Sequence, residues 1–198
     1  MEYSSLIDKV KMVITKPRDF FERAVGEPVT LPELIRSYVV VLAAVPAVGH
    51  LIGLGVVGRS FMGHHVTLGM KYTIPYVILW YLLTVVMAGV VSFLSSKLAP
   101  NFGGKEDLAS SAKAVIYSYT PAWVAGVFYI IPALGWIALV AGLYSLYLLY
   151  LSAGIVIGVP ENKKVGFVVI LVVASVVAWI LVGAIAQATM PGPARHVF

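Results

Sequence analysis

The strongest constraint on this chain is a long stretch, from Ala114 to Asn162, whose only charged residue is Glu161. At about 1.5 Å of rise per residue, one straight helix of that length would be about twice as long as the ~30 Å hydrocarbon core of a bilayer is thick. The stretch therefore has to fold back on itself. The motif "IIPALGW" favours a reversal at this point, because Pro132 cannot continue a helix and Gly135 permits a tight turn.

The composition indicates an integral membrane protein. Of the 198 residues, 60% are hydrophobic and only 12% are charged, whereas about a quarter of the residues of a soluble domain are charged. We expect an all-α polytopic fold that forms one domain, residues 1–198. The uncharged runs predict five transmembrane helices, preceded by an amphipathic cytoplasmic segment at 1–30, with the spans at about 34–58, 72–96, 112–131, 134–158 and 165–188.

The positions of Lys and Arg predict the orientation in the membrane. There are 14 of these residues, and with a cytoplasmic N-terminus all except Arg59, Lys71 and Arg195 fall on the cytoplasmic side. The positive-inside rule then places the C-terminus outside. Topology also accounts for the net charge of +5, so nucleic acid is not expected as a partner.

The residues before the first span have the pattern of a short amphipathic helix. The apolar residues recur at helical spacing, whereas Asp8, Lys9 and Lys11 lie on the opposite face; the apolar set is Leu6, Ile7, Val10, Val13 and Ile14. A second amphipathic helix is predicted to start at Pro17, with Phe20, Phe21, Ala24 and Val25 on its apolar face. We expect this segment to lie on the cytoplasmic leaflet, attracted by anionic lipids. The alternative is that it packs against the protein's own loops.

Polar groups that could carry chemistry are scarce within the expected spans. Apart from residues near the cytoplasmic ends, such as Arg36, these spans contain no Asp, Glu, Lys or Arg, which disfavours ion-coupled transport and catalysis. His50 is the one intramembrane candidate, and the alternative for it is a neutral imidazole bonded to a neighbouring backbone group or tyrosine. The chain has no cysteine, and the adjacent His64 and His65 lack the spacing of a metal site. No catalytic residue, metal or cofactor is therefore predicted.

A hydroxyl-rich stretch, "YSYTP", interrupts the third expected span. Pro121 has no N–H, so the carbonyl of Tyr117 loses its helical partner and needs another in a medium without water. Because the third and fourth spans form a hairpin, we expect hydroxyls of both helices to bond across it and to leave a small polar pocket. The predicted cluster is Tyr117, Tyr119, Thr120, Pro121, Tyr144, Ser145, Tyr147 and Tyr150. The alternative is a packing kink whose hydroxyls bond to their own helices.

Small residues recur four positions apart in several spans, a spacing that lets helices approach closely. The pairs are Gly49 and Gly53, Gly154 and Gly158, and Ala174 and Ala178. Packing within the chain is the simpler explanation, and a homo-oligomer interface is the alternative.

Three longer motifs, in this order and spacing, resemble the Yip (Ypt/Rab-interacting protein, YIPF) domain family of five-span membrane proteins. They are "KPRDFFERA", "NFGGKEDLASSAKAVIYSYTPAWV" and "IIPALGWIALVAGLYSLYLLYLSAGIVIGVPENKK". The resemblance implies a cytoplasmic N-terminus and, in eukaryotes, binding to prenylated small GTPases and trafficking partners. Only about 33 residues precede the first span here, as in the shorter prokaryotic branch, which has no Rab partner and would place the protein in the plasma membrane.

Two functions are compatible with these observations. The favoured one is a non-enzymatic scaffold that organises the bilayer or protein partners through its N-terminal segment and its basic cytoplasmic loops. The alternative is a channel or facilitator for a small solute, lined by the Tyr, Ser and Thr cluster.

Overall fold

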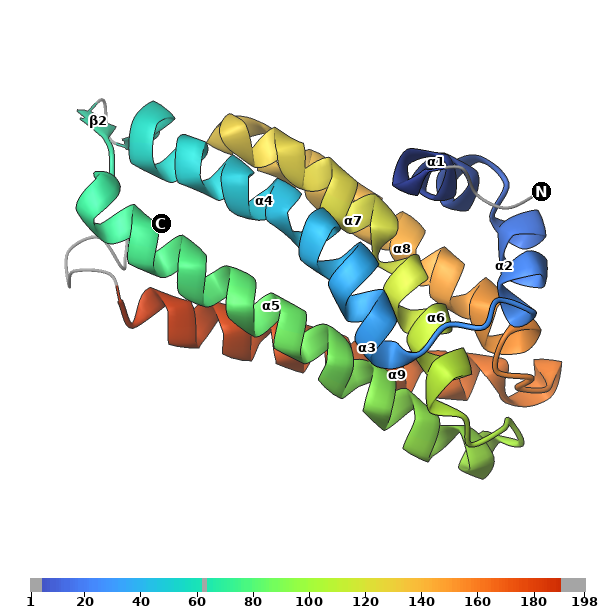
Figure 1. The fold of residues 1–198 in the computed structure, drawn as a ribbon. Coiled ribbons are helices and arrows are strands. Elements are labelled where there is room, and N and C mark those ends of the chain that lie inside the picture. The colour runs from blue at the N-terminus through green and yellow to red at the C-terminus, as the bar shows by residue number, and fades with distance from the viewer. Residues whose placement is uncertain (1–4, 62–63, 190–198) are drawn as a thin grey trace.

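The computed structural model describes residues 5–61 and 64–189, which form a bundle of long helices (Figure 1). The longest elements are α4 (Val40–Ile52), α5 (Met70–Leu98), α8 (Gly135–Ile155) and α9 (Glu161–Gln187). The shorter helices are α1 (Leu6–Thr15), α2 (Pro17–Val25), α3 (Leu31–Leu34), α6 (Leu108–Ser118) and α7 (Thr120–Ala125). Single turns of π- or 3₁₀-helix extend or join them at η1 (Ile35–Val39), η2 (Gly53–Val57), η3 (Ala99–Phe102), η4 (Gly126–Ile130) and η5 (Pro132–Leu134).

The all-α prediction is confirmed for the described residues apart from one short hairpin. Four helical stretches are long and apolar enough to cross a membrane, at Leu31–Val57, Met70–Phe102, Pro132–Ile155 and Glu161–Gln187. They correspond to the first, second, fourth and fifth expected spans. They exceed the predicted bounds mainly where polar residues such as Lys97 and Glu161 continue a helix beyond its apolar part.

The third expected span is helical but broken, so it is not one of the four long stretches. The segment 108–130 consists of α6, α7 and η4, with a break at Tyr119. Pro121 causes this break, because its nitrogen cannot donate to the carbonyl of Tyr117. The hydroxyl of Thr120 donates to that carbonyl instead, at 2.7 Å. The freed carbonyl is thus satisfied by a hydroxyl of its own segment, which corresponds to the alternative of a packing kink and not to the predicted bond across the hairpin.

The predicted reversal at "IIPALGW" is confirmed. Ile131 has an extended backbone between η4 and η5, after which α8 runs back along α6 and α7. The backbone of η4 packs directly against the first span. A Cβ atom at Gly49 would lie only 2.4 Å from the carbonyl oxygen of Gly126, and a Cβ atom at Gly53 would lie only 2.0 Å from the carbonyl oxygen of Tyr129. For this glycine pair, packing within the chain is thus confirmed.

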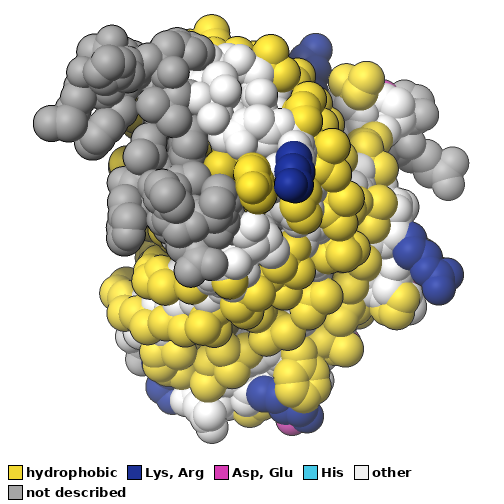
Figure 2. All heavy atoms as spheres, turned by 90° about the vertical axis from the view of Figure 1, so that its left-hand side faces the viewer, with side chains coloured by type: hydrophobic (Ala, Val, Ile, Leu, Met, Phe, Trp, Pro, Cys, Tyr) yellow, Lys and Arg dark blue, Asp and Glu magenta, His cyan; other side chains and the backbone are white. Residues whose placement is uncertain are grey.

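The end of the bundle opposite to α1 and α2 carries a feature that the sequence analysis did not predict. Strands β1 (Arg59–Phe61) and β2 (His64–Val66) form a short antiparallel hairpin in which Arg59 pairs with Val66. Gly58 and Gly69 flank this hairpin with φ values of 72° and 74°, a left-handed conformation that glycine adopts without a steric penalty. Figure 2 views this end and shows hydrophobic side chains over most of the visible surface, as expected for a membrane protein.

Candidate functional site

The N-terminal segment, residues 6–30, folds back against the bundle near the junction of α8 and α9 (Figure 1). Its two helices have the predicted apolar faces, but much of these faces is buried inside the protein. The fully buried residues are Val13, Phe20, Phe21 and Ala24. Packing on the protein itself is therefore a larger part of the role of this segment than the interfacial prediction assumed. Ile7 remains 76% exposed and is available to a lipid surface.

Phe20, from the motif "KPRDFFERA", packs against Tyr117, the first residue of "YSYTP". The ring of Phe20 meets that of Tyr117 edge to face, with centroids 4.9 Å apart. Tyr38 of η1 contacts another side of Tyr117 in the same way, at 5.0 Å. Because edge-to-face pairs add to the large apolar area that such rings bury, Tyr117 joins the N-terminal segment, the first span and α6 in one packed unit.

A buried lysine of α6 holds the end of α2. The side chain of Lys113 is almost completely inaccessible, and its ammonium donates to the carbonyl oxygens of Ala24, Val25 and Glu27 at 2.7, 3.1 and 3.1 Å. The last carbonyls of a helix lack internal partners and carry the negative end of the helix dipole. Lys113 therefore supplies both the missing donors and a compensating positive charge.

The carboxylate of Glu27 completes this arrangement. One oxygen pairs with the ammonium of Lys9, and the other accepts a hydrogen bond of 2.9 Å from the hydroxyl of Tyr117. Both charged side chains are about one-fifth exposed, so water screens their attraction only in part. We call the group Lys9, Glu27, Lys113 and Tyr117 the polar node.

Next to Tyr117, the hydroxyl groups of Tyr38 and Thr120 form a short chain of hydrogen bonds whose donors can be assigned. The hydroxyl of Thr120 lies 2.8 Å from that of Tyr38. A threonine hydroxyl has one proton, and Thr120 already donates it to the carbonyl of Tyr117. Tyr38 must therefore be the donor to Thr120, which connects the first span to the break in the third.

The remaining predicted cluster residues contact other elements, not one another across the hairpin. Tyr119 bonds to Ser175 of α9 at 2.7 Å, and Tyr144 donates to the carbonyl of Ile14 in α1 at 2.8 Å. Tyr150 bonds to Glu161 at the start of α9. Tyr119 and Tyr150 thus connect their segments to α9, and Tyr144 connects α8 to α1.

The predicted cross-helix bonds to Tyr144, Ser145 and Tyr147 are corrected accordingly. Ser145 donates to its own helix, at the carbonyl of Ala141, and Tyr147 is 51% exposed and stacks on Tyr144. The hydrogen bond between α6 and α8 lies one to two turns further along, between Ser118 and Ser152 at 3.3 Å. The hairpin was predicted correctly, but the rotation of α8 about its axis was not.

His50 lies among aromatic rings, near the end of α4 that leads to the β-hairpin. Its imidazole stacks on Tyr129 with centroids 4.3 Å apart and an interplanar angle of 12°, and Trp80 meets it edge to face at 5.2 Å. No group of three or more His, Cys, Asp or Glu side chains within 5–61 and 64–189 is arranged to hold a metal ion. The surroundings of His50 are those of a packed aromatic ring.

Sequence reasoning missed the acidic and basic members of the polar node. The sequence pattern assigns Lys9 only to the polar face of an amphipathic helix and Lys113 only to the cytoplasmic side, and it does not single out Glu27. One signal was available, because Lys113 is the only charged residue between Asp107 and Glu161, and it directly precedes the uncharged stretch. Nothing in the local pattern indicated that its partners would be the carbonyls of Ala24, Val25 and Glu27.

These observations define a class: a polytopic helical membrane protein whose N-terminal helices are anchored to one end of the bundle by a buried polar node. The chain belongs to the Yip1 domain family, whose sequence model matches residues 11–183. The match includes both the residues of "KPRDFFERA" and those of "YSYTP". Members of this family are generally non-enzymatic membrane proteins. No curated protein and no solved structure matches the chain.

Proposed function

We propose that the protein is a non-enzymatic scaffold that crosses the membrane five times and organises anionic lipids and acidic partner proteins at its cytoplasmic face. The observation that carries this proposal is the anchored N-terminal segment. Lys9 of the segment and Lys113 of α6 hold the segment in place, whereas the other basic residues of the segment are exposed: Lys11, Lys16, Arg18 and Arg23. The N-terminal segment therefore presents its exposed basic residues from a fixed position on the bundle, and we call it the cytoplasmic platform.

The five-span topology has support from the way the loops are grouped. The basic loop after α5 is joined to the loop before α9 by a bond of 3.1 Å from the N–H of Lys105 to the carbonyl of Ile157. Lys113 joins the same end of the bundle to α2. The basic residues predicted to be cytoplasmic therefore gather at one end, and α6, α7 and η4 together supply the odd crossing that places the C-terminus on the other side.

Single cysteines test this topology directly, because the chain has none of its own. Cysteines at the exposed positions Lys105 and Asn162 should react with a membrane-impermeant maleimide only from the cytoplasmic side, and a cysteine at Lys71 only from the outside. Labelling of Lys105 and Lys71 positions from the same side would overturn the five-span arrangement.

The lipid-organising role can be tested by energy transfer in vesicles. A donor dye at Asn162→Cys lies close to Arg18, since Arg18 and Glu161 line the same surface hollow. We expect more transfer to an acceptor on phosphatidylglycerol than to one on phosphatidylcholine, and the excess should shrink with added salt. The triple variant Lys11→Gln, Lys16→Gln and Arg23→Gln should remove the excess.

The matched control is Lys71→Gln, which removes an exposed charge at the opposite end of the bundle and should leave the excess unchanged. Equal transfer to both lipids in the unmodified protein would contradict the lipid-organising role. The alternative function, a pore for a small solute, predicts release of a trapped dye or sugar by reconstituted protein. The paired hydroxyls of "YSYTP" give that alternative little support, because they already bond to other protein groups.

A further inference from the structure

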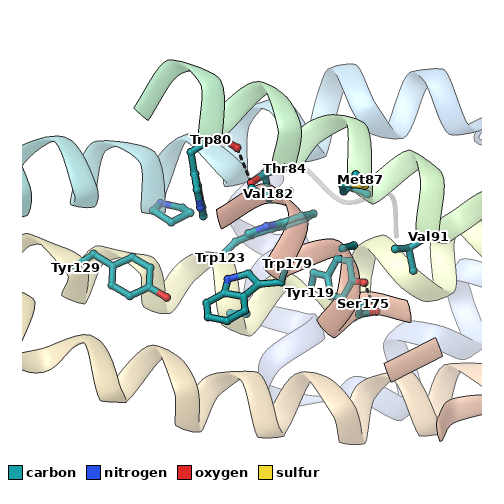
Figure 3. Close-up of a pocket in the computed structure, with 14 residues that line it drawn as sticks. Trp80, Thr84, Met87, Val91, Tyr119, Trp123, Tyr129, Ser175, Trp179 and Val182 are labelled. Carbon is teal, nitrogen blue, oxygen red and sulfur yellow. Dashed lines mark hydrogen bonds between the residues drawn. The ribbon is translucent and has the colours of Figure 1, made fainter. Parts of the chain in front are cut away.

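A second feature of the fold lies away from the polar node, at the centre of the bundle. A cavity of about 220 Å³ lies between α4, α5, α7 and α9. It is lined by Pro46, Trp80, Thr84, Met87, Ala88, Val91, Tyr119, Ala122, Trp123, Tyr129, Ser175, Ala178, Trp179 and Val182. Figure 3 shows that aromatic rings from three different elements, Trp123, Tyr129 and Trp179, converge on it.

The cavity lies at membrane depth and follows the helix axes. Its lining residues on α5 run from Trp80 to Val91, a rise of about 16 Å at ~1.5 Å per residue. That is about half of the ~30 Å hydrocarbon core. On α4 the lining residue is Pro46, in the middle of the first span.

Three hydroxyl groups in the lining, those of Thr84, Tyr119 and Ser175, are already paired with protein atoms. Tyr119 and Ser175 bond to each other, and Ser175 also donates to the carbonyl of Leu171. The hydroxyl of Thr84 donates to the carbonyl of Trp80 (Figure 3). An ordered water needs two to four polar partners, so the inner part of this cavity favours an apolar occupant over water.

The cavity is accessible from the bilayer. Trp179 is both a lining residue and 68% exposed, and on a membrane-spanning helix such a side chain faces lipid. The volume is below the ~300–1,000 Å³ of typical small-molecule sites, which suits one flexible chain better than a bulky ring system.

We propose that this cavity binds the end of one acyl chain of a bilayer phospholipid, which enters sideways past Trp179. The medium that surrounds the opening consists of such chains, and the mostly apolar and aromatic lining offers them close contact. This site is independent of the cytoplasmic platform proposed above, because it shares no residue with the polar node.

Photocrosslinking in the full-length reconstituted protein tests the proposal. The probe is a phosphatidylcholine with a diazirine at the terminal carbon of one acyl chain. We expect crosslinks on inward-facing lining residues such as Met87 and Trp123, as well as on lipid-facing residues such as Leu139 and Leu143, which are 73% and 63% exposed. A second probe, with the diazirine next to the headgroup, should leave Met87 and Trp123 unlabelled.

One variant should empty the site. Ala178→Phe adds a ring to a buried lining position of α9, and the crosslinks to Met87 and Trp123 should be lost while those to Leu139 and Leu143 persist. The matched control is Ala184→Phe, which places the same ring on an exposed position of the same helix and should change neither set. Labelling that persists at Trp123 in a folded Ala178→Phe protein would overturn the proposal.

The comparison of the two probes does not depend on any variant. If the chain-end probe labels Leu139 and Leu143 but not Met87 or Trp123 in the unmodified protein, no chain enters and the proposal is wrong. The same conclusion follows if both probes label Met87 and Trp123 equally, because the site would then lack selectivity for the chain end.

Discussion

Tyr117 and Tyr119 are separated by one residue, yet they belong to two different kinds of buried region. The hydroxyl of Tyr117 donates to a carboxylate in the polar node, whereas that of Tyr119 bonds to a neutral serine beside the apolar cavity. The difference shows how this fold handles polar groups near the membrane. The buried Lys113 lies where the N-terminal segment supplies carbonyls, and the buried Lys164 pairs with Glu161 at the start of α9. Around Tyr119, by contrast, the bonds join neutral hydroxyls and backbone carbonyls.

The two regions also differ in what they join. The polar node connects segments that are about 90 residues apart in the chain, such as Glu27 and Tyr117, and attaches a cytoplasmic segment to the bundle. The pair Tyr119 and Ser175 holds two membrane-spanning segments together. Removal of a node residue should therefore affect the docking of α1 and α2, whereas changes at Tyr119 should affect helix packing alone.

The largest effect should come from Lys113→Met, which keeps the length of the side chain but removes its charge and donors. The carbonyls of Ala24, Val25 and Glu27 would be left without this partner, and the loss of one partner from a buried charged network costs about 3–5 kcal/mol. Hydrogen–deuterium exchange should increase in α2 far more than in α5. The control Lys105→Met removes an exposed lysine and should have little effect. Unchanged exchange in α2 would mean that Lys113 does not hold the segment.

A smaller effect is expected for Tyr117→Phe, which removes a single hydroxyl and keeps the ring contacts with Phe20 and Tyr38. Hydrogen bonds to charged groups contribute about 1.5–3 kcal/mol, so the free energy of unfolding should fall by an amount in that range. Thermal unfolding in detergent measures it. In a double-mutant cycle with Glu27→Gln the two losses should not be additive, and strict additivity would argue against a direct bond.

Tyr119→Phe should cost less than Tyr117→Phe, although the two hydroxyls are similarly buried. The bond to Ser175 is between neutral groups, and hydrogen bonds between membrane helices average about 0.6 kcal/mol. Ser175→Ala provides the matched partner for a double-mutant cycle. A loss at Tyr119 equal to that at Tyr117 would break the distinction between a charged node and a neutral hydroxyl pair.

The smallest effect should come from Tyr147→Phe. The side chain is half exposed and stacks on Tyr144, so loss of the hydroxyl should change stability by less than about 0.5 kcal/mol. Combined with Thr120→Val it should be additive, whereas Tyr38→Phe combined with Thr120→Val should show coupling. Coupling between positions 147 and 120 would support the predicted hydroxyl cluster across the hairpin and contradict the arrangement in the structure.

The N-terminal segment illustrates the limit of local patterns. The spacing of its apolar residues correctly predicts two amphipathic helices, because a helix of this kind must bury one face. The pattern does not say what covers that face. Phe20 and Phe21 would suit a lipid surface as well as a protein groove. The groove that covers them is formed by α6, α7 and α8, which are far from this segment in the sequence.

The sequence by itself determined where the apolar helices lie along the chain and where they break or reverse. Helical rise and bilayer thickness are local constraints, so the apolar runs, the break at Pro121 and the reversal near Pro132 could be placed without a structure. The predicted pairing of the third and fourth spans is also present, since Ser152 of α8 lies beside Ala114 and Ser118 of α6.

Only the tertiary structure decided the direction in which each side chain points around its helix. Tyr144 lies at a depth that suits Thr120, but it points to the carbonyl of Ile14. The bend at Tyr119 and the backbone contact of Gly53 with η4 fix how the helices are rotated, and those contacts join residues far apart in the chain. Rotation about the axis depends on which neighbours a helix packs against, and no periodicity within one helix contains that information.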